Sequence, residues 1–386
     1  MNVPKLRFKE FNDEYKSIKL KAVSEIYDGT HETPNYVEKG VKFVSVENIS
    51  NLLDTTKFIP ESDYNKYKIK PKYNDVFMTR IGDIGTSSIY KSDDKLAYYV
   101  SLALLRTKDN HILIPDYLNQ YIKNNSFQKE LYNRTIHVAF PKKINTGEIG
   151  ECSINLCSDK EQLKVSNFLS LLDKKIELQF KKIEDLKLFK KGHINHIIEN
   201  NEIEKISLKN ILVEQNNKTS KNNEYEILSS TSKGIYLQKD YFNKQAASDN
   251  NVGYKILKKN QLVLSPQNLW MGNINVNTEY NIGIVSPSYK IFNISNNINI
   301  DFFNYWIKSP KALFEYKISS EQGASIVRRN LNMDLFYEII VDVPRGKLQN
   351  KVGKIIKLLN LNIQYNEFLL QKLSELKKGL MQNMFV

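Results

Sequence analysis

Apolar residues recur with a spacing of three and four over two long stretches of the chain. The first stretch runs from Asp159 to about Asn200 without a proline, and Gly192 is its only glycine. This spacing predicts a coiled-coil seam in each stretch, formed by Val165, Leu169, Leu172, Ile176, Ile183, Leu186, His193 and Ile197 in the first and by Val352, Ile356, Leu359, Ile363, Leu370, Leu373, Leu380 and Met384 in the second. Ser158 and Glu161 predict a capping box where the first helix begins. Each helix, at about 40 residues, would be roughly 60 Å long.

The two stretches are copies of one sequence element. Both contain Lys-Lys-Gly, at positions 190–192 and 377–379, and these glycines lie 379 − 192 = 187 positions apart in a chain of 386 residues. In the same register, identical residues recur as Gln162 and Gln349, Lys164-Val165 and Lys351-Val352, Ile176 and Ile363, and Leu186 and Leu373. Because solenoid repeats are far shorter, this period indicates a duplicated domain.

One polar position interrupts each predicted seam at the same place. It is Gln179 in the first copy and Asn366 in the second, and the next shared interruption is a lysine, Lys190 or Lys377. A polar residue in a seam costs stability but fixes register and partner. These positions favour two helices that pair with each other, antiparallel, as a spacer between two modules. The alternative is that each amphipathic helix packs only on its own domain.

The segments outside the helices are predicted to contain many short strands and helices. Residues 115–123 predict a helix, and residues 300–308 predict its counterpart at an offset of 301 − 116 = 185 positions. Framework elements match while the segments between them diverge. The predicted fold is therefore α+β, with two duplicated mixed α/β domains separated by a pair of long antiparallel coiled-coil helices. The expected boundaries are 1–157 for the first domain, 158–202 for the central helix, 203–346 for the second domain and 347–386 for the distal helix.

The charge balance of the chain points to a polyanionic partner. Lys and Arg number 56 against 43 Asp and Glu, which gives a net charge of +13 and a pI near 9.2. Nucleic acid is the first candidate and an acidic membrane surface the second, while a merely lysine-rich protein is the alternative. No apolar run approaches the roughly 18 residues that span a bilayer. The opening stretch is expected to be neither a signal nor a transit peptide, and the two cysteines, Cys152 and Cys157, fit neither a disulfide nor a metal pair. We therefore expect a cytoplasmic protein that does not bind membranes.

The divergent loops carry side chains and glycines suited to nucleic acid. Glycines let the backbone approach a phosphate, arginine reads guanine, and Gln and Asn read adenine. Each residue taken alone is a solvated loop side chain, but matched loops on a basic duplicated scaffold favour nucleic acid together. The candidates are His31, Thr33, Thr79, Arg80, Gly82, Arg134, His137, Lys142 and Lys143 in the first half and Lys233, Gln267, Asn268, Trp270, Gly323, Ser325, Arg328 and Arg329 in the second.

At this level the chain resembles the specificity subunit of type I restriction–modification systems. The resemblance rests on the opening residues 3–8, the turn at 29–34, the segments 80–85 and 322–325, and the two leucine-rich helices with their Lys-Lys-Gly. The duplicated order of domain, helix, domain, helix is its most specific feature. The first copy departs from the pattern because it lacks a Gly-Ala-Ser loop at 134–138.

The resemblance implies a non-catalytic subunit that recognises double-stranded DNA. Each globular half, as a target-recognition domain, would read one half of a bipartite asymmetric sequence. The paired helices, with Gln179 and Asn366 fixing their register, would set the spacing and dock two modification (adenine-N6 methyltransferase) subunits. Restriction subunits, which translocate and cleave DNA with ATP, would join the complex. No cofactor is expected on this chain, and S-adenosylmethionine, ATP and Mg²⁺ are expected on the partner subunits.

The motifs of the partner activities do not occur in the sequence. It contains neither the Asp/Asn-Pro-Pro-Tyr/Phe motif of an adenine methyltransferase nor a glycine-rich cofactor loop, and its five histidines show no metal-ligand spacing. The chain is thus expected not to be an enzyme. Two alternatives stay open: a coiled-coil scaffold, and a cryptic nuclease assembled from scattered carboxylates, neither with sequence-specific recognition.

Overall fold

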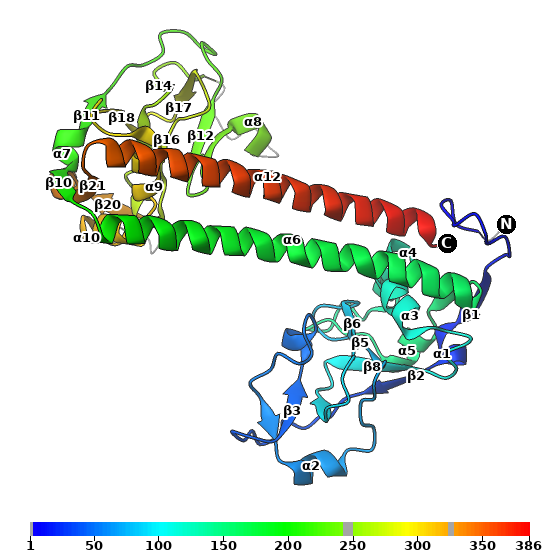
Figure 1. Ribbon diagram of the computed structural model, residues 1–386. Coiled ribbons are helices and arrows are strands. Elements are labelled where there is room, and N and C mark those ends of the chain that lie inside the picture. The colour runs from blue at the N-terminus through cyan, green and yellow to red at the C-terminus, as the bar shows by residue number, and fades with distance from the viewer. Residues whose placement is uncertain (1–2, 242–249, 323–327) are drawn as a thin grey trace. The chain divides into compact units, whose positions relative to one another are not determined.

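The computed structural model describes residues 3–241, 250–322 and 328–386 (Figure 1). These residues divide into two compact units. Unit 1 comprises Met1–Lys181 and Phe368–Val386, and unit 2 comprises Lys182–Glu367. Each unit therefore contains one globular domain and a part of each long helix, α6 (Asp159–Glu199) and α12 (Lys347–Met384).

The globular domain of unit 1 is built on a four-stranded antiparallel sheet in the order β2-β8-β5-β6. Strand β5 lies inside this sheet and is buried along its whole length. A two-stranded sheet, β1-β9, and a three-stranded sheet, β4-β3-β7, accompany it. The elements are β1 (Lys16–Lys19), α1 (Leu20–Val23), β2 (Ser24–Asp28), β3 (Val41–Val44), η1 (Val46–Asn48), β4 (Phe58–Ile59), α2 (Glu61–Lys66), β5 (Val76–Thr79), β6 (Ser87–Ile89), β7 (Leu96–Tyr98), β8 (Leu102–Thr107), α3 (Pro115–Ile122), α4 (Asn125–Arg134), α5 (Thr146–Gly150) and β9 (Ser153–Leu156).

The globular domain of unit 2 has a four-stranded antiparallel sheet in the order β11-β18-β15-β16. Four strand pairs accompany it in the part of the chain that the structure describes: β10-β21, β12-β13, β14-β17 and β19-β20. The elements are β10 (Ile203–Ser207), α7 (Leu208–Ile211), β11 (Leu212–Gln215), β12 (Leu228–Thr231), β13 (Gly234–Leu237), α8 (Gln238–Tyr241), β14 (Lys255–Lys258), β15 (Leu262–Leu264), η2 (Leu269–Met271), β16 (Ile274–Val276), β17 (Ile282–Val285), β18 (Lys290–Ile294), α9 (Ile300–Trp306), α10 (Pro310–Ile318), β19 (Ser320–Gln322), β20 (Arg329–Leu331), α11 (Met333–Glu338) and β21 (Ile340–Pro344).

The frameworks of the two domains are equivalent. The order β2-β8-β5-β6 corresponds to β11-β18-β15-β16, and the pair β1-β9 corresponds to β10-β21. The strand register agrees as well, because Val76 pairs with Leu105 in unit 1 and Leu262 pairs with Phe292 in unit 2. The sheet β4-β3-β7 belongs to unit 1, and the hairpins β12-β13 and β19-β20 belong to unit 2. The predicted duplication is confirmed, with divergence confined to the segments between framework elements.

Each domain core is closed by the beginning of one long helix and the end of the other. In unit 1, Val165 and Leu169 of α6 and Met381 of α12 belong to one buried apolar cluster. In unit 2 the equivalent residues of the repeat do the same: Val352 and Ile356 of α12 with Ile194 of α6. The two helices are therefore antiparallel within each unit, and they pack both on each other and on the domains.

Burial confirms the predicted seam. Of the predicted capping box, the hydrogen bond to the Ser158 side chain forms, but the one from the Glu161 side chain does not. All sixteen seam positions are buried or half-buried. Ser158 Oγ accepts a hydrogen bond from the Glu161 amide at 3.4 Å, as the box requires. The Glu161 carboxylate does not complete the box, because it instead accepts hydrogen bonds from Arg7 at 2.8 Å and from Tyr15 at 3.0 Å. Residues far away in the sequence thus fasten the beginning of α6.

The polar seam residues give a testable expectation about register. Asn366 is 1% exposed, and its Nδ2 donates to the Asn362 carbonyl at 2.7 Å, while Gln179 is half-buried. Replacing both by leucine should raise the free energy of unfolding by roughly 1–3 kcal/mol per site, because a buried amide is removed. The same change should broaden the distribution of distances between spin labels placed on α6 and α12, since the polar residues no longer fix the register. Gln364→Leu, at an exposed position of α12, is the control. An unchanged distribution in the double variant would contradict the register role.

Candidate nucleic-acid interface

Three of the predicted loops in unit 1 meet around Arg80. This side chain is 6% exposed, its Nε donates to the Ile144 carbonyl at 3.1 Å, and its Nη1 donates to the Val100 carbonyl at 3.1 Å. Nη1 also lies 3.6 Å from Asp28 Oδ2. Burial lowers the pKa of the Arg80 guanidinium, and the charge of Asp28 opposes this effect. Arg80 therefore holds three segments together, and we assign it this positioning role in place of the predicted contact with a base.

Main-chain hydrogen bonds join the segment after β5 to the basic loop that precedes α5. The Gly82 amide donates to the Lys142 carbonyl at 2.8 Å, the Ile144 amide donates to the Arg80 carbonyl at 3.0 Å, and Ile81 forms a β-bridge with Lys143. Gly82 has φ +81°, a conformation that favours glycine, and space is open around the position of a Cβ. Thr79, by contrast, is buried, and its Oγ1 accepts from the Thr86 amide at 3.0 Å and so closes the turn. The structure gives Thr79 a role in shaping the loop.

The turn after β2 lies against the same group of loops. The Thr30 amide donates to the Tyr98 carbonyl at 3.1 Å, and a Cβ on Gly29 would sit 2.3 Å from that oxygen, so only glycine fits. His31 Nε2 lies 3.0 Å from Asp28 Oδ2, the carboxylate that also faces Arg80. His31 and Thr33 are exposed. The predicted residues His31 and Thr33 are thus accessible to a ligand, on the turn that lies beside Arg80.

The loop at 136–143 presents two lysines and an apolar tip. Lys142 and Lys143 are exposed, and His137 is held by a contact of 2.9 Å between Nε2 and the Tyr132 carbonyl. Arg134 faces elsewhere, because it forms ion pairs with Glu148 at 2.9 Å and Glu130 at 3.5 Å.

Sequence reasoning missed the tip of this loop. Val138 is 96% exposed and Phe140 is fully exposed. The available signal was an isolated valine and phenylalanine between His137 and the Lys142-Lys143 pair. Apolar side chains surrounded by basic ones are the combination that proteins insert between DNA bases or stack on them.

We expect Phe140→Ala to weaken binding to duplex DNA without destabilising the domain. A base–aromatic contact contributes roughly 1–3 kcal/mol, so the dissociation constant should rise by about tenfold or more. Phe140 contributes little to the core, and the thermal midpoint should therefore stay unchanged. Fluorescence anisotropy with labelled duplex measures the affinity, and Ile112→Ala, another exposed apolar residue of unit 1, is the control. Equal affinities for both variants would contradict the role of the tip.

Unit 2 joins the corresponding loops through different residues. The Arg329 amide donates to the Gln267 carbonyl at 3.1 Å, which ties β20 to the segment after β15. The Arg329 side chain is half-buried, and its Nε donates to Ser320 Oγ at 2.9 Å. Gln267 and Arg328 are exposed. The predicted residues Gly323 and Ser325 lie outside the described residues.

A lysine that was not among the candidates from the sequence joins two loops of unit 2. Lys308 Nζ donates to the Gly272 carbonyl at 2.7 Å and to the Ser232 carbonyl at 3.0 Å. Burial lowers the pKa of Lys308 to about 8. The bonds link the β12-β13 turn, which carries exposed Lys233, to the segment with Asn268 and Trp270, both half-buried. The sequence signal for Lys308 was its place at the end of the segment 300–308, which matches 115–123 and in which Lys308 corresponds to Lys123.

The described residues give no sign of two other kinds of site. Among them, no group of three or more His, Cys, Asp or Glu side chains could hold a metal ion. Within the same ranges, every helix is too short or too polar to cross a membrane.

Comparison with known proteins identifies the fold. No family model matches the sequence. The crystal structure of the type I restriction–modification S subunit from M. genitalium aligns with a TM-score of 0.63 and 15% sequence identity, over 100% of this chain and 99% of that chain. This chain has the fold of a type I specificity subunit. A chain from a structure on complex assembly and conformational transition of the type I restriction–modification system aligns with a TM-score of 0.53 and 9% identity, over 96% of this chain and 97% of that one.

The specificity-subunit fold agrees with the architecture expected from the sequence. Two duplicated mixed α/β domains and a pair of long antiparallel helices are confirmed.

Proposed function

We propose that this chain is the non-catalytic DNA-recognition subunit of a type I restriction–modification complex. Each target-recognition domain reads one half of a bipartite asymmetric duplex sequence, and the paired helices set the spacing between the halves. The observation that carries this proposal is one framework present twice with different loops. A shared framework presents loops in equivalent places, and different loops contact different base pairs.

The exposed groups of the two loop clusters differ in chemistry. Unit 1 presents His31, Lys142 and Lys143, whereas unit 2 presents Lys233, Gln267 and Arg328. Lysines that contact phosphates supply affinity, and Gln and Arg can form paired hydrogen bonds to adenine and guanine. This difference supports two half-sites of different sequence, and the net charge of +13 supports duplex DNA as the ligand.

The long helices carry equivalent apolar residues that are exposed in the described chain. In unit 1 the exposed residues include Leu171, Leu178 and Leu376, and in unit 2 they include Leu358, Tyr365 and Phe189. The second set is the first set shifted by the 187-residue repeat. Exposed apolar patches mark protein interfaces, and two equivalent patches fit two identical partners. We infer that two methyltransferase subunits dock here.

The chemistry of the complex would belong to its other subunits. Adenine-N6 methylation would use S-adenosylmethionine on the methyltransferase subunits. ATP-dependent translocation and cleavage would use ATP and Mg²⁺ on restriction subunits. The role of this chain is then to place a given base pair before the methyltransferase.

Mapping of methylated adenines across the genome tests the proposal. Cells with the gene should methylate a split motif, and cells without the gene should lose that motif. Replacing residues 15–157 by the corresponding domain of another specificity subunit should change one half of the motif and keep the other. A purified complex that binds every duplex equally, with no motif in cells, would favour the scaffold alternative and overturn the proposal.

A further inference from the structure

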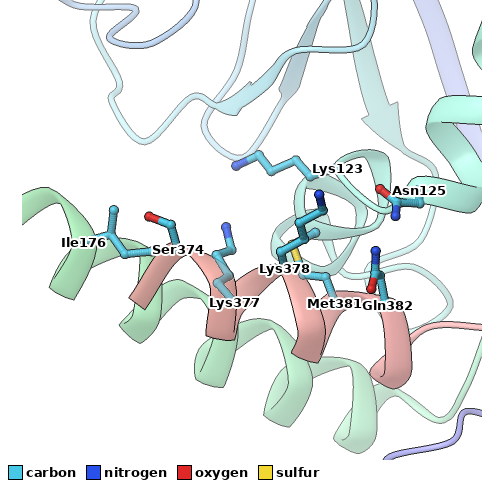
Figure 2. Close-up of a pocket in the computed structure, with 8 residues that line it drawn as sticks. All are labelled: Lys123, Asn125, Ile176, Ser374, Lys377, Lys378, Met381 and Gln382. Atoms are coloured by element: carbon cyan, nitrogen blue, oxygen red, sulfur yellow. The ribbon is translucent and has the colours of Figure 1, made fainter. Parts of the chain in front are cut away.

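A pocket in unit 1 gathers three lysine side chains beside the C-terminal part of α12. It has a volume of about 270 Å³ and is lined by residues that include Lys123 after α3, Asn125 at the start of α4, and Lys377, Lys378 and Gln382 of α12. Figure 2 shows Lys377 and Lys378 extending from α12 towards the side of the pocket where Lys123 lies. All of these residues belong to one compact unit, so the pocket is a feature of that unit alone.

The positive charge of the pocket exceeds what the neighbouring groups neutralise. Asp173 is already engaged, because it accepts hydrogen bonds from Lys377 and, at 2.8 Å, from Gln120 Nε2. Lys123 is half-buried and Lys378 is exposed, and among the described residues neither side chain has a hydrogen-bond or ion-pair partner. Burial lowers the pKa of Lys123, and nearby Lys377 adds to this effect while Asp173 opposes it. A partly desolvated ammonium without an acceptor favours the entry of an anion.

The beginning of α4 adds a second source of positive potential. This helix has ten residues, Asn124 caps it by accepting from the Phe127 amide at 2.9 Å, and its first turn contains no acidic residue. The first N–H groups of a helix have no acceptor within the helix and carry partial positive charge. Asn125, the first residue of α4, lines the pocket. A helix N-terminus next to lysines is a common environment for a phosphate group.

The equivalent place in unit 2 differs at the counterpart of Lys123. Lys308, the counterpart of Lys123, donates to two main-chain carbonyls, at 2.7 and 3.0 Å. Lys190, the counterpart of Lys377, donates to Asn360 at 2.9 Å and lies over the ring of Tyr305. Pro310, which has no N–H, begins the helix α10 where Asn125 begins α4. The framework therefore does not require an open basic pocket, and the one in unit 1 calls for a separate explanation.

We propose that this pocket binds a phosphate group of the DNA backbone next to the half-site read by the first domain. This phosphate site rests on the proposed function of the chain in DNA recognition. Ammonium groups, a side-chain amide and a helix N-terminus are the groups that contact DNA phosphates, and they carry no base specificity. The pocket would anchor one side of the asymmetric complex to the backbone, with no matching anchor in unit 2.

Ethylation interference with the assembled complex tests this inference. In the wild type, ethylating one phosphate that flanks the first half-site should block binding. Lys378→Gln, alone and with Lys123→Met, should abolish the interference at that phosphate, weaken binding several-fold on all sequences, and reduce the slope of log K against log salt by about 0.9 per lost contact. Lys191→Gln is the matched control, because Lys191 is the exposed counterpart of Lys378 in unit 2.

Each other outcome overturns the inference. An interference pattern and salt slope identical to those of the wild type would remove the phosphate from the pocket. Loss of methyltransferase binding in Lys378→Gln, with the DNA contacts unchanged, would mean that the pocket receives an acidic side chain of a protein. Failure of the proposed function would look different: the wild-type complex would give no sequence-specific footprint, while the salt slope on any duplex would still report on Lys378.

Discussion

The substitution Arg80→Ala is expected to destabilise the globular domain of unit 1 and, under the proposed function, to abolish recognition of one half-site. The change removes the Arg80 donor from two carbonyl groups, that of Ile144 in a buried and that of Val100 in a part-buried environment. Each such loss costs about 1–3 kcal/mol, so the free energy of unfolding of this domain should fall by roughly 2–4 kcal/mol. The loops that carry His31 and Lys142 would then lose their common support.

Hydrogen exchange followed by mass spectrometry measures this effect domain by domain. Exchange should accelerate in the segments around Asp28, Val100 and Ile144 and stay unchanged in unit 2. Lys142→Ala, in the same loops but exposed, is the control and should affect DNA affinity alone. A stable Arg80→Ala protein with relaxed specificity at a single base pair would show that Arg80 leaves its buried position to read a base.

Under the proposed docking of two methyltransferase subunits, an aspartate at Leu178 or at Tyr365 is expected to remove one of these subunits from the complex. Both side chains are exposed, so the fold should tolerate the change. An interface that covers either side chain would lose about 1.5–3 kcal/mol of favourable apolar burial. It would also have to bury the charge of the aspartate, which is unfavourable. Together these effects should weaken docking by roughly 100-fold or more. Native mass spectrometry should show one methyltransferase subunit with either single variant and none with the double variant.

The matched control for this experiment is Glu177→Asp. It puts the same aspartate at the neighbouring exposed position, about 100° away around the helix, and should retain two subunits. Full stoichiometry in the Leu178→Asp and Tyr365→Asp double variant would show that the partners dock on another surface.

The repeat and the periodicity of the sequence were sufficient to predict the framework. The apolar spacing that includes Val165 and Val352 predicted both long helices, and the seam positions are buried or half-buried as expected. The matched segments at 115–123 and 300–308 correspond to α3 and α9 with the residues that follow them. Such patterns are visible along the chain because one buried face imposes a regular spacing on its residues.

The direction of the loop side chains was not predictable in the same way. Arg80 was predicted to contact DNA, but its guanidinium donates to carbonyl groups 20 and 64 positions away in the sequence and is buried in the domain. Phe140 has no such partner and stays outside. Whether a loop residue is buried depends on segments that only folding brings near, and no local spacing records them.

The duplication, the helices and their seam can thus be predicted from the sequence alone, because they follow from regular patterns of burial. Tertiary structure alone decided which polar groups hold the loops and which stay available. Lys123, Lys377 and Lys378 illustrate this division: the Lys-Lys-Gly repeat was visible in the sequence, but its two copies look equivalent there. Their surroundings differ in the structure because Lys308 finds two carbonyl acceptors in unit 2, whereas its counterpart Lys123 lines a pocket with Lys377 and Lys378 in unit 1.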